Sequence, residues 1–107
     1  MATLEPAAIG VIGVTGDDIF GRELRRQFHE LGVDTTHLVT QPENFDTVAF
    51  AKPYLEGQEQ ARLDFGFRNQ RTRATDEALL ASIEHALQTV DVLIMNQQVP
   101  GLSLIHI

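Results

Sequence analysis

The sequence lacks several features that would define a function class. None of its 107 residues is cysteine, which excludes disulfide bonds and thiolate metal sites. No apolar run approaches the roughly 18 residues that a membrane-spanning helix needs. Only 8 Lys and Arg stand against 15 Asp and Glu, a formal net charge of −7, and such an acidic chain is poorly suited to nucleic acid. Residues 1–8 do not resemble a secretory signal. We therefore expect a cytoplasmic protein with neither nucleic-acid nor membrane partners.

Common catalytic and metal-binding signatures are also missing. No serine stands at a nucleophile elbow with histidine and aspartate partners. The four histidines show no metal-ligand spacing; they are His29, His37, His85 and His106. His85 falls on the polar side of a predicted helix, and we interpret it as a surface residue. The chain is 43% hydrophobic and 21% charged, which together with its length indicates one small globular domain.

The clearest pattern is a strand, a glycine turn and a helix over residues 8–31. Residues 8–14 are rich in β-branched side chains and predict a strand covered on both faces. Asp17 and Asp18 suit a helix start, where a carboxylate accepts hydrogen bonds from free N–H groups, so we predict that at least one of them is the cap. Gly32 suits the helix end. One apolar stripe supports the helix: Phe20, Leu24, Phe28 and Leu31.

The glycines of this segment raise the question of a dinucleotide site. Gly10, Gly13 and Gly16 are spaced G-x-x-G-x-x-G, whereas the dinucleotide fingerprint is G-x-G-x-x-G. No acidic residue ends an apolar strand about 20 residues further on. The spacing argues against a nicotinamide cofactor.

Residues 37–67 change to a period of two, which predicts three antiparallel strands at residues 37–40, 47–51 and 62–67. Pro53 is expected to end the pairing of the middle strand. The pattern fits either an inserted β lid or a plain meander packed on the core. Arg68, Arg71 and Arg73 follow in a connector, where a solvated surface is favoured over a phosphate site.

A second helix and strand are predicted after this connector. Thr75 is the expected N-cap, with Asp76 and Glu77 in the first turn. The expected buried face consists of Leu79, Leu80, Ile83, Leu87 and Val90. Residues 92–95 form an apolar run typical of a central parallel strand. Asn96 and Gln98 follow it, at the strand end where ligands bind in open α/β sheets. A polar transition from strand to loop explains these two residues equally well.

Residues 12–21 (IGVTGDDIFG) and then 31–35 (LGVDT) resemble, in order, a segment of the PfkB (ribokinase-like) carbohydrate kinases. The resemblance extends over residues 9–100. It implies an α/β chain with a partial ribokinase-like fold: a βα unit, an antiparallel β lid insertion, then an αβ unit. Residues 52–66 (KPYLEGQEQARLDFG) are more similar to heptose-phosphate kinase/adenylyltransferases than to ribokinase.

The resemblance implies transfer of the ATP γ-phosphate to a hydroxyl of a sugar or sugar phosphate, with magnesium. Ala49 and Ala51 resemble lid positions that face the sugar. Gln98 takes the place of a family glutamate near the sugar and the metal–phosphate region, and Asn96 is the second candidate there. A homodimer formed through the lid is a further expectation.

Other family motifs are absent from the sequence, namely Gly-Gly…Asn and the GAGD segment with the catalytic base. We therefore expect the chain to be inactive by itself, marginally stable, and part of a longer enzyme. Residues 102–107 (LSLIHI) resemble translated adaptor sequence and are expected to be non-native, the alternative being a short C-terminal strand. Two other functions stay open: a non-catalytic sugar-binding or interaction module, and an unrelated nucleotide-binding α/β domain.

Overall fold

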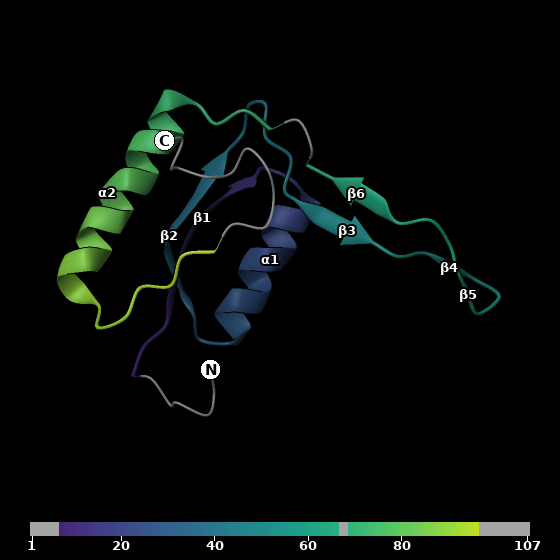
Figure 1. Ribbon diagram of the computed structural model, residues 1–107, viewed down its shortest axis with the longest axis horizontal. Coiled ribbons are helices and arrows are strands. Elements are labelled where there is room, and N and C mark those ends of the chain that lie inside the picture. Colours follow the sequence, from purple (N-terminus) through teal and green to yellow (C-terminus); the bar gives the residue numbers. More distant parts are fainter. Residues whose placement is uncertain (1–6, 67–68, 97–107) are drawn as a thin grey trace.

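The computed structural model describes residues 7–66 and 69–96. Figure 1 shows two helices beside a small sheet and a long hairpin that projects from it. In chain order the elements are β1 (Gly10–Gly16), α1 (Ile19–Glu30), β2 (Asp34–Gln41), β3 (Ala49–Ala51), β4 (Tyr54–Leu55), β5 (Gln58–Glu59), β6 (Leu63–Phe65) and α2 (Arg73–Thr89). Gln98 and the suspected tail at 102–107 lie outside the described residues. The chain is mixed α/β, as the sequence predicts.

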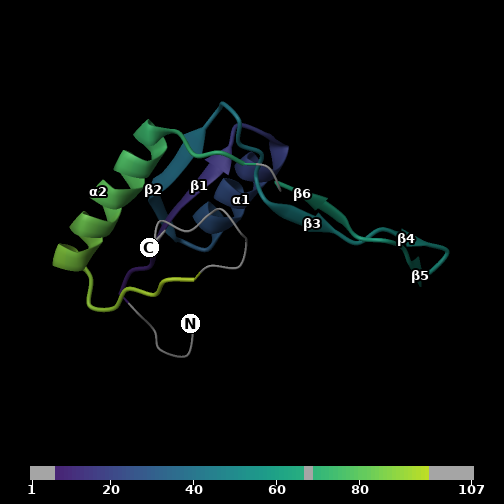
Figure 2. The same cartoon turned by 45° about the horizontal axis from the view of Figure 1, so that its top comes forward.

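β1 and β2 form a two-stranded parallel sheet between the two helices. Their register pairs Gly13 with Leu38 and Gly16 with Gln41. Arg25 of α1 donates to the Thr40 hydroxyl, whereas His37 contacts Ser82 of α2. Because neighbouring side chains of a strand point to opposite faces, α1 and α2 cover opposite faces of the sheet. Figures 1 and 2 show this arrangement from two directions.

The first helix forms where the sequence predicts it. Asp18 is the N-cap of α1, and its side chain accepts a hydrogen bond from the Gly21 N–H. Gly32 follows the helix with φ +72°, a left-handed conformation that glycine adopts without steric cost. The Gly32 and Val33 N–H groups donate to carbonyls of the last helical turn. Both predicted ends of the helix are confirmed to within one residue.

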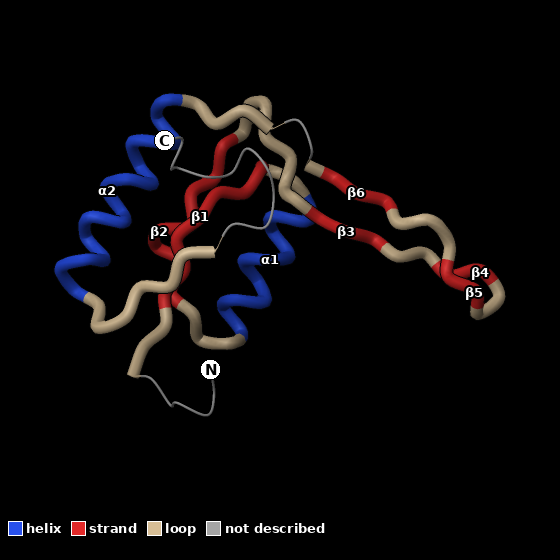
Figure 3. Tube along the Cα trace, viewed as in Figure 1, coloured by secondary structure: helices blue, strands red, loops and turns tan. Residues whose placement is uncertain are grey.

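Residues 49–65 form one long antiparallel hairpin, which Figure 3 shows in red and tan. β3 pairs with β6, and further out β4 pairs with β5 around the turn at Glu56 and Gly57. The prediction of three antiparallel strands is wrong for residues 37–40. These residues belong to β2, which pairs in parallel with β1, because α1 carries the chain back to the same end of the sheet before β2 begins.

α2 begins earlier than predicted. Thr72 is its N-cap and accepts a hydrogen bond from the Thr75 N–H, so the assignment of Thr75 as the cap is wrong. Three predicted core residues, Leu80, Leu87 and Val90, are instead exposed. Leu79 is buried as expected, and the other buried positions of α2 are small or polar: Thr75, Ser82 and Ala86. This face packs on β1 and β2, where small side chains allow a close approach.

The predicted strand at residues 92–95 is also wrong. No strand is assigned there, and Val92, Ile94 and Met95 are 75%, 70% and 61% exposed. Within the described ranges, β1 and β2 pair only with each other. An apolar run forms a strand only where the backbone of a neighbouring strand is available for hydrogen bonding. Within the described residues, no strand pairs with this run. Neither described helix has the length and apolarity needed to cross a bilayer.

Two glycines of β1 differ sharply in the space around them. A Cβ on Gly16 would lie 2.3 Å from the Phe45 carbonyl oxygen, whereas a Cβ on Gly13 would lie 3.6 Å from Leu38 Cδ1, an ordinary contact. We expect Gly16→Ala to lower the free energy of unfolding by about 1–3 kcal/mol, since backbone must move.

The matched control for that prediction is Gly13→Ala on the same strand. We expect this variant to change the free energy of unfolding by no more than about 1 kcal/mol. Urea unfolding followed by circular dichroism measures both variants. Equal destabilisation by the two substitutions would contradict the steric assignment at Gly16.

Candidate functional site

The candidate site lies where the hairpin meets the carboxyl ends of β1 and β2. Gly16, the last residue of β1, donates its N–H to the Thr47 hydroxyl at 2.9 Å, just before β3. Ligands of open α/β sheets bind at the carboxyl ends of the strands. The base of the hairpin therefore stands at the edge of the sheet where a ligand is expected.

One face of the hairpin carries both of the predicted lid alanines. Ala49 pairs with Phe65 and Ala51 with Leu63, and residues directly opposite each other share a face. We call these four side chains the alanine face. The Phe65 ring lies 5.2 Å from the ring of Phe20, between centroids, so the alanine face turns toward the start of α1. Ala49 and Ala51 are half-buried, and their small side chains leave room on this face.

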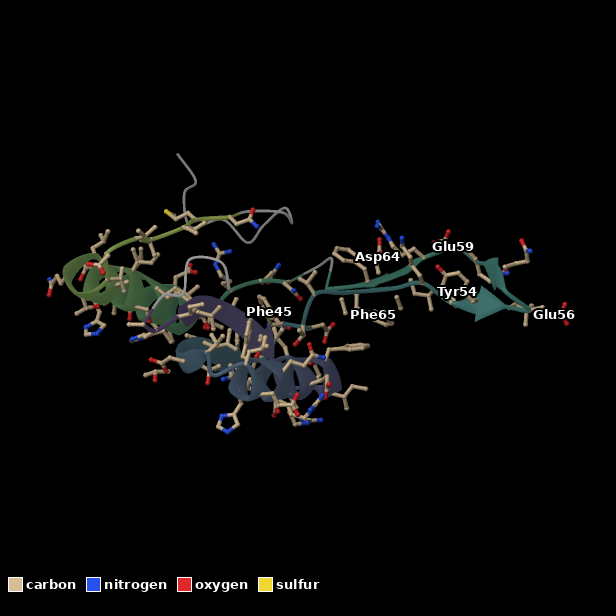
Figure 4. All side chains as sticks on the ribbon, turned by 90° about the horizontal axis from the view of Figure 1, so that it is seen from below. Phe45, Tyr54, Glu56, Glu59, Asp64 and Phe65 are labelled. Carbon is tan, nitrogen blue, oxygen red and sulfur yellow. The ribbon has the colours of Figure 1, made fainter. Side chains whose placement is uncertain are left out.

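The opposite face of the hairpin is held by a charged cluster. Arg62 Nε lies 2.7 Å from Asp64 Oδ1, and the guanidinium of Arg62 lies 4.9 Å above the centre of the Phe50 ring. Asp64 Oδ1 is buried in this ion pair, and Asp64 Oδ2 accepts a hydrogen bond from Arg62 Nη2 at 3.1 Å. Figure 4 shows Asp64 well out along the hairpin, away from Phe45 at its base. This carboxylate is therefore committed to Arg62.

Asp18 and Thr47 form a compact latch between α1 and the hairpin. Asp18 Oδ1 accepts from the Gly21 N–H at 2.8 Å and from the Thr47 hydroxyl at 2.7 Å, while Oδ2 accepts from the Thr47 N–H at 2.9 Å. A Cβ on Gly21 would lie 2.5 Å from the Gly16 carbonyl oxygen. The latch therefore explains the spacing of Gly16, Asp18 and Gly21 as a packing requirement.

The latch also settles what the paired aspartates do. Asp18 is the helix cap, whereas Asp17 is exposed and forms a surface ion pair with Arg22 at 3.3 Å. Burial raises the pKa of the Asp18 carboxyl, but hydrogen bonds from Thr47 and Gly21 outweigh it and leave the pKa below its usual value. A carboxylate held by three donors is poorly placed to act as a general base.

A polar pocket of about 390 Å³ opens at the base of the hairpin, beyond the end of β2. Its lining consists of Pro42, Asn44, Phe45, Asp46, Asn69 and Gln70. The Asn69 amide binds both the N–H and the carbonyl of Asp46, each at 2.8 Å, which joins the two sides of the hairpin base. Amide groups around a single carboxylate suit a hydroxyl-bearing ligand better than an anion.

Gln41 and Thr47 are the residues of this region that sequence reasoning missed. Gln41 is 2% exposed. Its Nε2 donates to the Gln70 carbonyl at 2.8 Å, and its Oε1 accepts from the Thr72 N–H at 2.9 Å. It thereby ties the end of β2 to the start of α2. Both residues act on partners about 30 positions away in the chain, so no local pattern could identify them.

The other predicted site residues within the described part of the chain are not gathered here. Asn96 is exposed, lies beyond α2 and does not follow a strand, while Gln98 falls outside the described residues. Of the connector arginines, Arg71 is mostly buried and pairs with Asp76 at 2.6 Å. Arg73 is exposed and pairs with Glu77 at 3.2 Å. Of the three predicted substrate contacts within the described residues, the structure brings together Ala49 and Ala51.

Comparison with known proteins gives one informative match. No model of a protein family matches the chain. The chain is 27% identical over 95 residues to the "Bifunctional protein HldE" of Wolinella succinogenes, a match that covers 89% of the chain. It spans 20% of the length of that protein. The similarity supports a carbohydrate-kinase-like relation.

We expect Asp18→Ala to lower the free energy of unfolding by about 1–3 kcal/mol, because it removes the cap of α1 and leaves the Thr47 donors without an acceptor. The neighbouring Asp17→Ala serves as the control and should change it by no more than about 0.5 kcal/mol. Chemical denaturation of both variants measures the difference. A larger loss for Asp17→Ala than for Asp18→Ala would show that the latch is assigned to the wrong carboxylate.

The latch also predicts a dependence of stability on pH. Because the pKa of Asp18 is lowered from 3.8 in the folded chain, its stabilisation is complete above about pH 4 and is lost as the pH falls through the folded-state pKa. We expect the stability difference between the wild type and Asp18→Asn to shrink from pH 6 toward pH 2.5. Hydrogen bonds from Thr36 lower the pKa of Asp34 as well, so the difference from the variant isolates Asp18. A difference independent of pH would contradict the prediction.

Proposed function

We propose that this chain is part of a sugar kinase that transfers the γ-phosphate of ATP to a hydroxyl of a sugar or sugar phosphate. The observation that carries the proposal is the 27% identity with the protein HldE along nearly the whole chain. HldE is a bifunctional sugar kinase/adenylyltransferase. The resemblance of residues 52–66 to heptose-phosphate kinase/adenylyltransferases points to the same group.

The geometry supports a sugar-binding role for the hairpin. The alanine face lies beside the carboxyl ends of the parallel strands and turns toward Phe20. In the proposal Ala49 and Ala51 lie against the sugar ring, since small side chains admit a ring that larger ones would exclude. The hairpin then acts as a ribokinase-like lid, which positions the sugar and keeps water from the transferred phosphoryl group.

The described residues supply none of the remaining kinase chemistry. Within residues 7–66 and 69–96, no group of three His, Cys, Asp or Glu side chains could hold a metal ion. Asp18 is occupied by the latch. We therefore assign the catalytic base, ATP and Mg²⁺ to other parts of a longer protein. Gln98 and Asn96 of this chain stay proposed as sugar contacts.

A non-catalytic sugar-binding module is the second candidate. A binding module requires no base, and the engagement of the Asp18 carboxylate in the latch is compatible with it. The test measures sugar binding and ATP turnover in every protein that contains this segment. Saturable sugar binding without ATP turnover would favour the binding module over the kinase.

We further propose a cytoplasmic location, where ATP is available, and a homodimer formed through the hairpin. Phe50, Tyr54 and Leu55 are 54%, 64% and 65% exposed, and exposed apolar side chains along one hairpin favour a protein partner. Sedimentation of the chain and of a Tyr54→Lys variant tests the homodimer. A monomeric wild type at micromolar concentration would contradict it.

The kinase proposal is tested in the longer protein that contains this segment, by ADP release with a panel of sugars and sugar phosphates. We expect Ala51→Leu to raise the KM for the sugar roughly tenfold with little change in the KM for ATP, because the added side chain enters the proposed sugar position. The 107-residue chain by itself is expected to release no ADP.

The matched control is Ala61→Leu, the same substitution at an exposed position of the same hairpin. It should leave both KM values unchanged. If Ala51→Leu and Ala61→Leu behave alike while the protein stays active, the alanine face does not contact the sugar.

A further inference from the structure

β2 and α2 bring together three side chains that are far apart in sequence. His37 Nδ1 lies 2.9 Å from the Ser82 hydroxyl. The rings of His37 and His85 lie close together, with centroids 5.4 Å apart and planes tilted by 43°. His85 is exposed, as the sequence predicts, but it is not isolated. This cluster lies on the α2 face of the sheet, apart from the alanine face.

Ser82 fixes the hydrogen position on His37. The Ser82 hydroxyl is buried and donates its hydrogen to the Ala78 carbonyl at 2.9 Å. It must therefore accept from His37, which places the ring hydrogen on Nδ1 and leaves a lone pair on Nε2. In metal-binding histidines, one ring nitrogen binds the ion while the other donates to a fixed acceptor. His37 is oriented in the same way, with Nδ1 as the donor and Nε2 free to bind an ion.

The spacing of the two rings fits coordination of one cation. Two imidazoles on a tetrahedral ion with metal–nitrogen bonds of about 2.0–2.1 Å have ring centres roughly 5 Å apart, close to the observed 5.4 Å. The chain carries a formal charge of −7, which favours the approach of a cation.

We propose that His37 and His85 form a two-histidine site for a divalent transition-metal ion of the zinc, nickel and copper class. Imidazole ligands select these ions over magnesium, which prefers oxygen. No third His, Cys, Asp or Glu joins this pair within the described ranges. The remaining coordination positions are filled by water and are open to a further ligand.

The test uses the untagged 107-residue chain and Ni²⁺ as the probe, by calorimetric titration at pH 7.5. We expect one Ni²⁺ per chain for the wild type. Affinity should fall at least tenfold in His37→Gln and in His85→Gln, and about 10–100-fold in Ser82→Ala, as is typical when a ligand loses its orienting partner. The control is His29→Gln, which removes an exposed histidine of α1. This variant should bind Ni²⁺ with the affinity of the wild type.

A second measurement locates the ion and does not depend on the variants folding. Substoichiometric Cu²⁺ should broaden the imidazole NMR signals of His37 and His85 before those of His29. Equal broadening of all histidines, absence of stoichiometric Ni²⁺ binding, or unchanged affinity in His85→Gln would each overturn the proposal and leave the two rings as a packing contact.

Discussion

The hydrogen-bonded latch between Asp18 and Thr47 is the interaction on which the arrangement of this chain depends. One carboxylate accepts from the first turn of α1 and from both donors of Thr47, and the Thr47 hydroxyl in turn accepts from the end of β1. β1, α1 and the base of the hairpin are therefore joined through the Thr47 side chain and its hydrogen bond to Asp18. The close approach leaves no room for a Cβ at Gly16 or Gly21, so the latch also determines which residues can stand around it.

Polar contacts of this kind matter because the apolar core is small. In the described part of the chain, four hydrophobic residues are buried, whereas five buried residues are polar: Thr15, Gln41, Thr47, Thr75 and Ser82. Directional hydrogen bonds from such groups set the orientation of the helices and hairpin more narrowly than apolar contact does. Arg25 adds to this network, since it donates to the Leu38 carbonyl at 2.7 Å and to the Thr40 hydroxyl.

The same constraint bears on function. By fixing the base of the hairpin at the carboxyl ends of the strands, the latch holds Ala49 and Ala51 where a sugar would lie in the proposed kinase. It also engages the Asp18 carboxylate, which the sequence assigns to the helix cap. In the proposed kinase, the described residues would hold the sugar, and the chain spans 20% of the length of the HldE protein that it matches.

The sequence by itself determined the local elements whose signals lie within a few residues: β1, α1 with its Asp18 cap and Gly32 end, and the alternating strands β3 and β6. Only the tertiary structure decided the parallel pairing of β2, the early start of α2 at Thr72 and the absence of a strand at residues 92–95. Strand pairing and burial depend on partners distant in sequence, which periodicity does not report. The same reason explains why no sequence pattern identified the contacts of Thr47 and Gln41 or the pairing of the His37 and His85 rings.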